Sequence, residues 1–359
     1  MIRVLSIDGG GIRGIIPATV LAEIERRTGR PIAELFDLIA GTSTGGILAL
    51  GLTRPGPDGA PSYTAEALID LYVAEGAHIF SRSPWHRLRS LGNLIEEKYP
   101  SRGIESVLEQ YFGTTRLKEA LTDVVVTSYE IEQRTAWFFR SRNARQQPDY
   151  DFSMTQVARA TSAAPTYFEP LRIASAETNN EYALVDGGVF ANNPALCGYV
   201  DARRSYPDAN DFLVVSLGTG ELTHSLPYDK VKGWGVANWA RPILSVVFDG
   251  INDTIDYQLR QLLPAGPDGQ RRYYRLQTRL EPGIDNMDRT DREHLQTLRL
   301  VAETLLREHN EELDLLCRQL VVKTPDRATV AGSALQAPAA PERAAATSRR
   351  RERVHSSKG

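Results

Sequence analysis

One serine stands in a setting that suits nucleophilic catalysis. The segment Gly41-Thr42-Ser43-Thr44-Gly45 matches the pattern G-x-S-x-G, in which a serine occupies a sharp strand-to-helix turn and exposes its hydroxyl. The two glycines are needed because larger residues would clash in so strained a turn. Such a serine attacks a carbonyl carbon and forms an acyl-enzyme that water then hydrolyses. We therefore predict that Ser43 is a nucleophile.

A serine nucleophile needs a partner that accepts its proton. Asp186 follows the strand-like segment 181–185 and precedes Gly187-Gly188, so we expect its carboxylate to project at the same sheet edge as Ser43. An aspartate is a weak base, with a reference pKa of about 3.9, but burial weakens its solvation and raises that pKa. We predict a Ser43–Asp186 dyad.

Histidine is the more usual partner of a catalytic serine. Of the six histidines, His224 is the one that follows a predicted strand closely. Ser43, Asp186 and His224 also occur in the chain order of the α/β-hydrolases. A histidine-dependent esterase is therefore an alternative, and His224→Ala would separate the two mechanisms.

A glycine-rich loop lies near the amino terminus. The segment Asp8-Gly9-Gly10-Gly11-Ile12-Arg13-Gly14 contains the spacing G-x-G-x-x-G between a predicted strand and a helix. Consecutive backbone N–H groups at a helix start can hold a phosphate or an oxyanion. A dinucleotide site would also need an acidic residue about 20 positions further on, at a strand end. Glu23 and Glu25 lie within the predicted helix instead, although a non-catalytic nucleotide or lipid binder stays open as a second alternative.

The elements that must position these residues alternate between strand and helix. Predicted strands cover residues 3–8, 35–42, 123–130, 134–140, 181–185 and 211–216. Predicted helices cover residues 17–27, 44–52, 64–80, 101–111, 153–163 and 291–320, and residues 232–263 are predicted to be mostly helical. This alternation is typical of a parallel α/β sheet, whose sites form at the carboxyl ends of the strands.

Composition bounds the remaining possibilities. The chain has 359 residues with 42% hydrophobic and 24% charged residues, which is ordinary for a globular enzyme. The net charge of −3 argues against a nucleic-acid partner. We see no signal peptide and no apolar run long enough to cross a bilayer, and Cys197 and Cys317 do not suggest a disulfide framework. These features favour a cytoplasmic protein whose membrane contact is at most peripheral.

The last part of the chain differs from the rest. Residues 324–359 are rich in Ala, Pro, Ser and Arg and carry seven Lys/Arg against three Asp/Glu. They contain no periodic apolar face, so we predict one folded domain over 1–323 and a disordered tail over 324–359.

The three motifs together resemble the patatin-like phospholipase family. They are Asp8–Gly14, Gly41–Gly46 and Asp186–Gly188, in that order. Further stretches that resemble the family are Ala158–Phe168, Val189–Pro194 and Ser216–Gly220. The resemblance spans roughly residues 3–280 and implies a three-layer α/β/α fold with a mainly parallel central sheet.

The resemblance also implies an activity and roles for residues. It implies a lipid acyl hydrolase of the phospholipase A type in which Ser43 attacks the ester carbonyl and Asp186 accepts the proton, without a catalytic histidine, metal or cofactor. The backbone N–H groups of Gly9, Gly10 and Gly11 would form the oxyanion hole.

Two further features concern the lipid itself. In the family pattern, Arg13 is a basic residue that helps to fix the glycine loop or a lipid phosphate. Acyl chains need an apolar groove, for which Trp85 with Leu88 and Leu91, and the stretch 234–244, are candidates. Core packing is the competing interpretation of both segments. The implied partner is a lipid at a membrane or micelle surface, while the head group and oligomeric state are not specified by the sequence.

Overall fold

A single eight-stranded sheet forms the centre of the structure, a computed structural model that describes residues 1–81, 99–178, 180–222, 225–239 and 242–322. The strands follow the order β5-β6-β3-β2-β1-β7-β9, with β4 paired to β3 outside this path. Their bounds are β1 (Ile2–Ile7), β2 (Leu38–Thr42), β3 (Asp123–Glu130), β4 (Thr135–Arg140), β5 (Leu171–Ala174), β6 (Glu181–Asp186), β7 (Phe212–Leu217) and β9 (Tyr273–Leu276). A separate pair joins β8 (Glu221–Leu222) to β10 (Arg279–Leu280).

The sheet has a parallel part and an antiparallel part. Strands β3, β2, β1, β7 and β9 are parallel to one another, whereas β4 and β6 run antiparallel to β3, and β5 antiparallel to β6. The central strands β1, β2 and β7 are buried almost throughout, as expected for parallel strands covered on both faces. A mainly parallel sheet is therefore confirmed.

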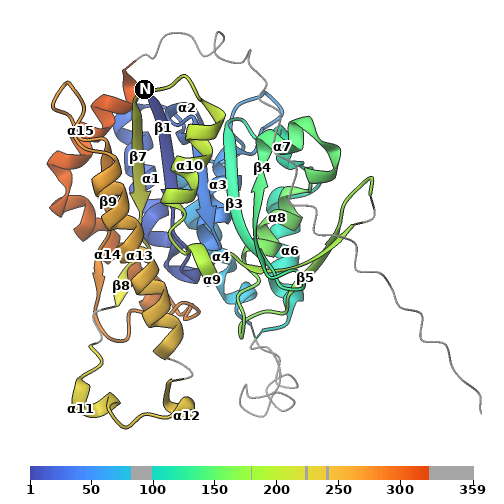
Figure 1. The fold of residues 1–359 in the computed structure, drawn as a ribbon, viewed down its shortest axis with the longest axis vertical. Coiled ribbons are helices and arrows are strands. Elements are labelled where there is room, and N and C mark those ends of the chain that lie inside the picture. Colours follow the sequence, from blue (N-terminus) through green and yellow to red (C-terminus); the bar gives the residue numbers. More distant parts are fainter. Residues whose placement is uncertain (82–98, 179, 223–224, 240–241, 323–359) are drawn as a thin grey trace, which may run out of the picture. The chain divides into compact units, whose positions relative to one another are not determined.

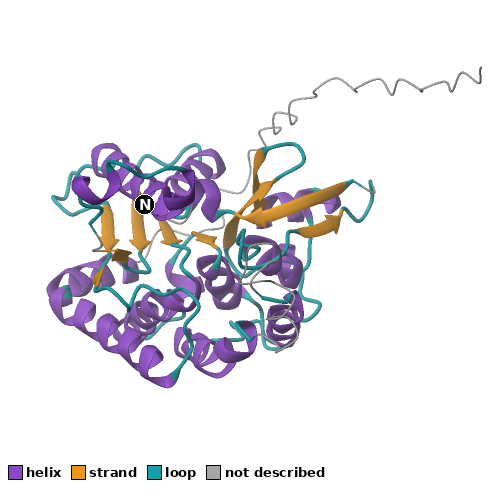
Figure 2. Cartoon of the chain, turned by 90° about the horizontal axis from the view of Figure 1, so that it is seen from below, coloured by secondary structure: helices purple, strands orange, loops and turns teal. Residues whose placement is uncertain are grey.

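Helices cover both faces of the sheet, which makes three layers (Figures 1 and 2). The larger layer consists of α1 (Ile15–Thr28), α3 (Thr44–Thr53), α4 (Ala65–Ile79), α6 (Ser101–Phe112), α8 (Met154–Thr161), α14 (Arg292–Glu308) and α15 (Asn310–Val321). The other layer consists mainly of α10 (Ala195–Ser205) and α13 (Pro242–Leu262). The shorter helices are α2 (Ile32–Leu35), α7 (Ser141–Gln146), α9 (Gly188–Ala191), α11 (Tyr228–Val231) and α12 (Val236–Trp239). Three 3₁₀ helices complete the set: η1 (Gly11–Gly14), η2 (Leu117–Glu119) and η3 (Pro148–Tyr150).

Two apolar cores lie on opposite faces of the sheet. Within β1, Leu5 and Ile7 pack into the core beneath α1 and α3, while Val4 belongs to the core beneath α10. Successive side chains of a strand point to opposite faces, so one buried strand supplies both cores. Among the described residues, no helix is long and apolar enough to cross a bilayer.

Most predicted elements are found, with two corrections. The predicted strand 35–42 begins only at Leu38, because Leu35 ends the short helix α2. The predicted helix 291–320 is two helices, and the chain departs from helical geometry at His309. Both segments have helical periodicity, but α14 and α15 each pack against α1, and the bend permits both contacts. The stretch 232–263 is mostly helical as predicted and contains α12 and α13. The predicted tail lies outside the described residues.

Candidate active site

Ser43 occupies a strained turn between β2 and α3. Its φ of 55° and ψ of −122° are unfavourable for a residue with a side chain. The turn is possible because its glycines allow close backbone contact. A Cβ atom at Gly41 would overlap the carbonyl group of Gly45, and one at Gly45 would overlap that of Ile7. The geometry agrees with the turn predicted from the motif.

The backbone of Ser43 is fixed by a residue that the sequence analysis did not single out. The Ser43 N–H donates to Oγ1 of Thr161 at 2.8 Å, and that hydroxyl donates to the carbonyl of Thr127 at 2.7 Å. Thr161 is fully buried at the end of α8. Its position within the family-like stretch 158–168 was the only signal for it, since a threonine in a predicted helix is otherwise unremarkable.

The side chain of Ser43 lies close enough to the carboxylate of Asp186 to lower the pKa of that carboxyl. Oδ1 of Asp186 accepts a hydrogen bond of 2.7 Å from the Gly188 N–H. Asp186 is only 5% exposed. Burial raises its pKa to about 6, against the opposing effects of the Ser43 side chain and the Gly188 N–H. A carboxylate with a raised pKa is a better proton acceptor than a solvated aspartate.

The route by which Asp186 reaches Ser43 differs from the prediction. We expected two strand ends at one edge of a parallel sheet, but β6 runs antiparallel to β3. It overlaps β3 over three residue pairs and stops with Asp186 opposite Ser128. On the other side of β3, Thr42 lies opposite Thr127. The register of β6 against β3 therefore places Asp186 at the same height in the sheet as the end of β2, which Ser43 follows.

The glycine loop follows β1 and lies against the nucleophile. A Cβ atom at Gly9 would be 3.3 Å from Cβ of Ser43. The Gly9 N–H donates to the carbonyl of Asn192 at 3.0 Å, so this group is already engaged and does not fit the oxyanion-hole role predicted for it. Within the described parts of the chain, the N–H groups of Gly10 and Gly11 donate to no backbone carbonyl. These two donors are the ones available to an anion.

Arg13 lies beneath this loop and is 8% exposed. Its Nε donates to the carbonyl of Gly10 at 3.3 Å, and its guanidinium contacts the carbonyl of Gly220 at 3.4 Å. Burial lowers its pKa, while nearby carboxylates, Asp285 foremost, act against this effect. Of the two roles considered for Arg13, these contacts favour fixing the loop over binding a lipid phosphate.

A buried ion pair underlies the start of the loop. Asp8 contacts Arg275 of β9 at 2.7 Å, and Arg275 also donates to Oγ of Ser216 at 2.8 Å. Burial raises the pKa of Asp8, while Arg275 opposes that change. Asp8 and Arg275 are 267 positions apart in the chain, and no sequence pattern linked them.

Among the described residues, the contacts of the histidines do not support the histidine-dependent mechanism. His294 faces the carbonyl of Asn286, and His309 pairs with Glu312. His224 lies outside the described residues. In a serine triad the histidine stands between the serine and the acid, but here the Asp186 carboxyl is itself close enough to the Ser43 side chain for that side chain to lower its pKa.

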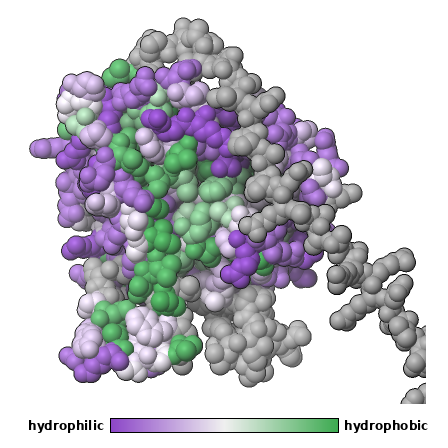
Figure 3. Space-filling view, viewed as in Figure 1, coloured by the Kyte–Doolittle hydropathy of each residue, from purple (hydrophilic) through white to green (hydrophobic). Residues whose placement is uncertain are grey.

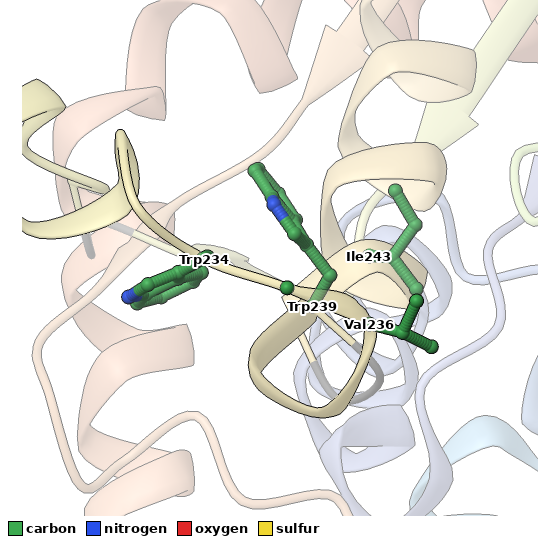
Figure 4. A pocket seen from close by; sticks show the side chains of 5 residues that line it. Trp234, Val236, Trp239 and Ile243 are labelled. Carbon is green, nitrogen blue, oxygen red and sulfur yellow. The ribbon is translucent and has the colours of Figure 1, made fainter.

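The segment around α12 lies on the side of the sheet toward which the parallel strands run (Figure 1), and hydrophobic residues are exposed on this face of the molecule (Figure 3). This segment forms an apolar pocket. Its volume is about 450 Å³, and it is lined by residues of the segment 234–243 (Figure 4). The indoles of Trp234 and Trp239 meet edge to face at 5.5 Å. Val236 is 89% exposed and Ile243 43% exposed, so these two side chains are not core residues. The segment containing Trp85 lies outside the described residues.

Comparison with known proteins gives consistent results. The sequence profile of the patatin-like phospholipases matches residues 5–196. The chain is 31% identical to patatin-like protein 4 of Arabidopsis thaliana over 85% of this chain and 83% of that protein. It is 32% identical to patatin-like protein 2 of Oryza sativa subsp. indica, over 88% and 86% of the two chains. It is also 34% identical to a potato (Solanum tuberosum) protein named probable inactive patatin-3-Kuras 1, over 77% and 78%. Similarity to this group alone therefore does not decide whether a chain is active.

Proposed function

The chain belongs to the patatin-like phospholipase family, a group of lipid acyl hydrolases, and we propose that it cleaves acyl esters of phospholipids or related lipids through Ser43 and Asp186. The observation that carries this proposal is that the side chain of Ser43 lies close enough to the Asp186 carboxylate to lower the pKa of that carboxyl. This arrangement places a strained serine beside a buried carboxylate whose pKa is about 6.

The first half of the reaction forms an acyl-enzyme. Oγ of Ser43 attacks the ester carbonyl carbon while Asp186 takes the hydroxyl proton. The carbonyl oxygen becomes an oxyanion, which the N–H groups of Gly10 and Gly11 stabilise. When the tetrahedral intermediate collapses, the proton passes from Asp186 to the leaving alcohol.

The second half releases the fatty acid. A water molecule gives its proton to Asp186 and attacks the acyl carbon, and the same two N–H groups stabilise the second oxyanion. Collapse breaks the bond to Oγ, and Asp186 returns the proton to Ser43. Each cycle restores the starting protonation states, so one acid–base residue is sufficient.

The electrostatic surroundings suit this chemistry. The start of α3 directs partial positive charge toward Ser43, and Asp186 is shielded from water. Hydrogen bonds to an oxyanion are stronger in such a dry site than in water. Losing one oxyanion donor typically lowers the rate on the order of 10²–10³-fold.

The decisive experiment is mass-spectrometric analysis of lipids released from mixed liposomes. We expect free fatty acids and lysolipids from the wild-type protein, and none above background from Ser43→Ala or Asp186→Ala. His224→Ala should retain activity, whereas its collapse would favour the triad. Labelling by a fluorophosphonate that disappears in Ser43→Ala would identify the nucleophile, and an unlabelled, inactive wild-type protein would favour a non-catalytic binder.

A further inference from the structure

The orientation of the glycine loop is controlled from its carbonyl side. In a trans peptide the C=O and N–H groups point in opposite directions, so whatever holds one carbonyl also directs the N–H of the next residue. The Gly9 carbonyl accepts a hydrogen bond of 2.6 Å from Oγ1 of Thr219. The Gly10 carbonyl accepts from Arg13. The N–H groups of Gly10 and Gly11 therefore point away from these two anchors.

The strand order shows toward which neighbouring strand the N–H of Gly10 points. Strand β1 lies between β2 and β7. Ser43 follows β2 and Thr219 follows β7, so the two residues flank the glycine loop from opposite sides. Because the Gly9 carbonyl is drawn toward the β7 side, the N–H of Gly10 is directed toward the β2 side, where Ser43 stands.

Thr219 is itself held firmly. It is 2% exposed, and its neighbours are tied to the end of β9 and the residue after it. The Gly218 N–H donates to the carbonyl of Leu276 at 2.9 Å, and the Gly220 N–H to the side chain of Gln277 at 2.8 Å. The Thr219 hydroxyl is thus fixed by the sheet and does not follow the glycine loop.

The side chain of Thr219 also fills the space beside the loop. A Cβ atom at Gly10 would overlap both Oγ1 and Cβ of Thr219. This contact gives a steric reason for the glycine at position 10. Glycine peptides rotate easily, so a loop of three glycines needs an external anchor to keep one orientation.

We propose that Thr219 is a positioning residue of the oxyanion hole, whose hydroxyl holds the Gly9–Gly10 peptide with its N–H toward the reacting carbonyl. The proposal rests on the function proposed above. Without the anchor, the peptide could rotate and present a carbonyl oxygen to the developing negative charge. Because Arg13 still holds the next peptide, the loss should be partial.

The experiment compares Thr219→Val and Thr219→Ser with the wild-type chain. Valine keeps the shape and removes the hydroxyl, whereas serine keeps the hydroxyl. Thr53→Val is the matched control, because Thr53 is also fully buried and its hydroxyl also donates to a backbone carbonyl, that of Ala49 at 2.7 Å. The readouts are kcat and KM for a soluble short-chain ester, the thermal unfolding midpoint, and inhibition by an alkyl trifluoromethyl ketone. That ketone forms an oxyanion-like adduct with the serine.

For Thr219→Val we expect kcat to fall about 10- to 100-fold, somewhat less than the loss of a whole donor. KM should change little, and inhibition by the ketone should weaken in parallel with kcat/KM. Thr219→Ser should recover most of the activity, and Thr53→Val should keep wild-type kinetics.

Two results would overturn the proposal while leaving the proposed function intact. One is wild-type kcat and ketone inhibition in a folded Thr219→Val. The other is a loss in Thr219→Val that matches the loss of folded protein and is not restored by serine. If the wild-type chain itself hydrolyses no ester, the proposed function fails, and this inference fails with it.

Discussion

The two sides of Ser43 are built in different ways. On one side, the glycine loop and the serine turn follow adjacent parallel strands, and their glycines bring backbones into close contact. On the other side, Asp186 arrives on an antiparallel strand that overlaps its neighbour over three residue pairs. The oxyanion side is held by a network of hydrogen bonds, whereas the base side depends on burial, the nearby Ser43 side chain and one hydrogen bond from the Gly188 N–H. The comparison teaches that the oxyanion side supplies rigid backbone donors, whereas the base side supplies a carboxylate whose charge is destabilised by burial.

The largest expected effect comes from neutralising the base. Asp186→Asn should lower kcat by about 10³-fold or more, because the amide cannot accept the Ser43 proton. The same change should stabilise the fold at pH 7 by on the order of 3 kcal/mol, since each unit of pKa shift corresponds to about 1.4 kcal/mol. Urea unfolding at several pH values measures the second effect.

The sign of this stability effect follows from the raised pKa. Below about pH 4 the carboxyl is protonated in both the folded and unfolded states, so the wild-type chain carries no penalty. Above about pH 6 it is charged in both, and the penalty is complete. The stability advantage of Asp186→Asn should therefore grow between pH 4 and 6. An advantage that does not change over this range would contradict a buried, destabilised charge.

A substitution on the oxyanion side should lower the free energy of unfolding, whereas Asp186→Asn should raise it. Arg275→Met leaves Asp8 buried without its partner, which typically costs about 3–5 kcal/mol. The double variant Asp8→Asn with Arg275→Met should recover part of that loss. Denaturant midpoints of the three variants measure the effect. If Arg275→Met were as stable as the wild type, the rigid side would not depend on this ion pair.

A smaller effect is expected between the two sides, where Thr161 holds the nucleophile turn. Thr161→Val leaves the Ser43 N–H without an acceptor, at a cost of about 1–3 kcal/mol. The strained turn should relax, and kcat should fall about tenfold, since each 1.4 kcal/mol of lost alignment is a tenfold change in rate. Thr161→Ser should restore both values. If Thr161→Val had wild-type kcat and stability, the turn at Ser43 would not depend on the hydrogen bond to Thr161.

The mildest test uses pH alone. If Asp186 is the base, kcat/KM for a soluble ester should rise with pH and level off above about pH 6, where the carboxylate is ionised. Below that value it should fall about tenfold per pH unit. In Arg275→Met this acidic limb should stay in place, because Arg275 contacts Asp8 and not Asp186. A flat profile between pH 5 and 8 would exclude Asp186 as the titrating base.

The sequence determined the parts of this protein that are local. The motif around Ser43 requires small residues at fixed spacing, and the glycine loop requires a strand before it and a helix after it, so both could be predicted with their flanking elements. The capping serine at position 153, which accepts a hydrogen bond from the Gln156 N–H, is local in the same way. The central parallel strands could be predicted because they are apolar almost throughout.

Only the tertiary structure decided the long-range parts. The antiparallel arrival of Asp186, the engagement of the Gly9 N–H by Asn192, and the anchors Thr161, Thr219 and Arg275 were not predictable from spacing. A hydrogen bond between residues hundreds of positions apart leaves no periodic trace in the chain. It exists because strand register and the packing of two cores bring those groups within 3 Å of each other. A sequence pattern states which residues can react, whereas register and packing decide which atoms face one another.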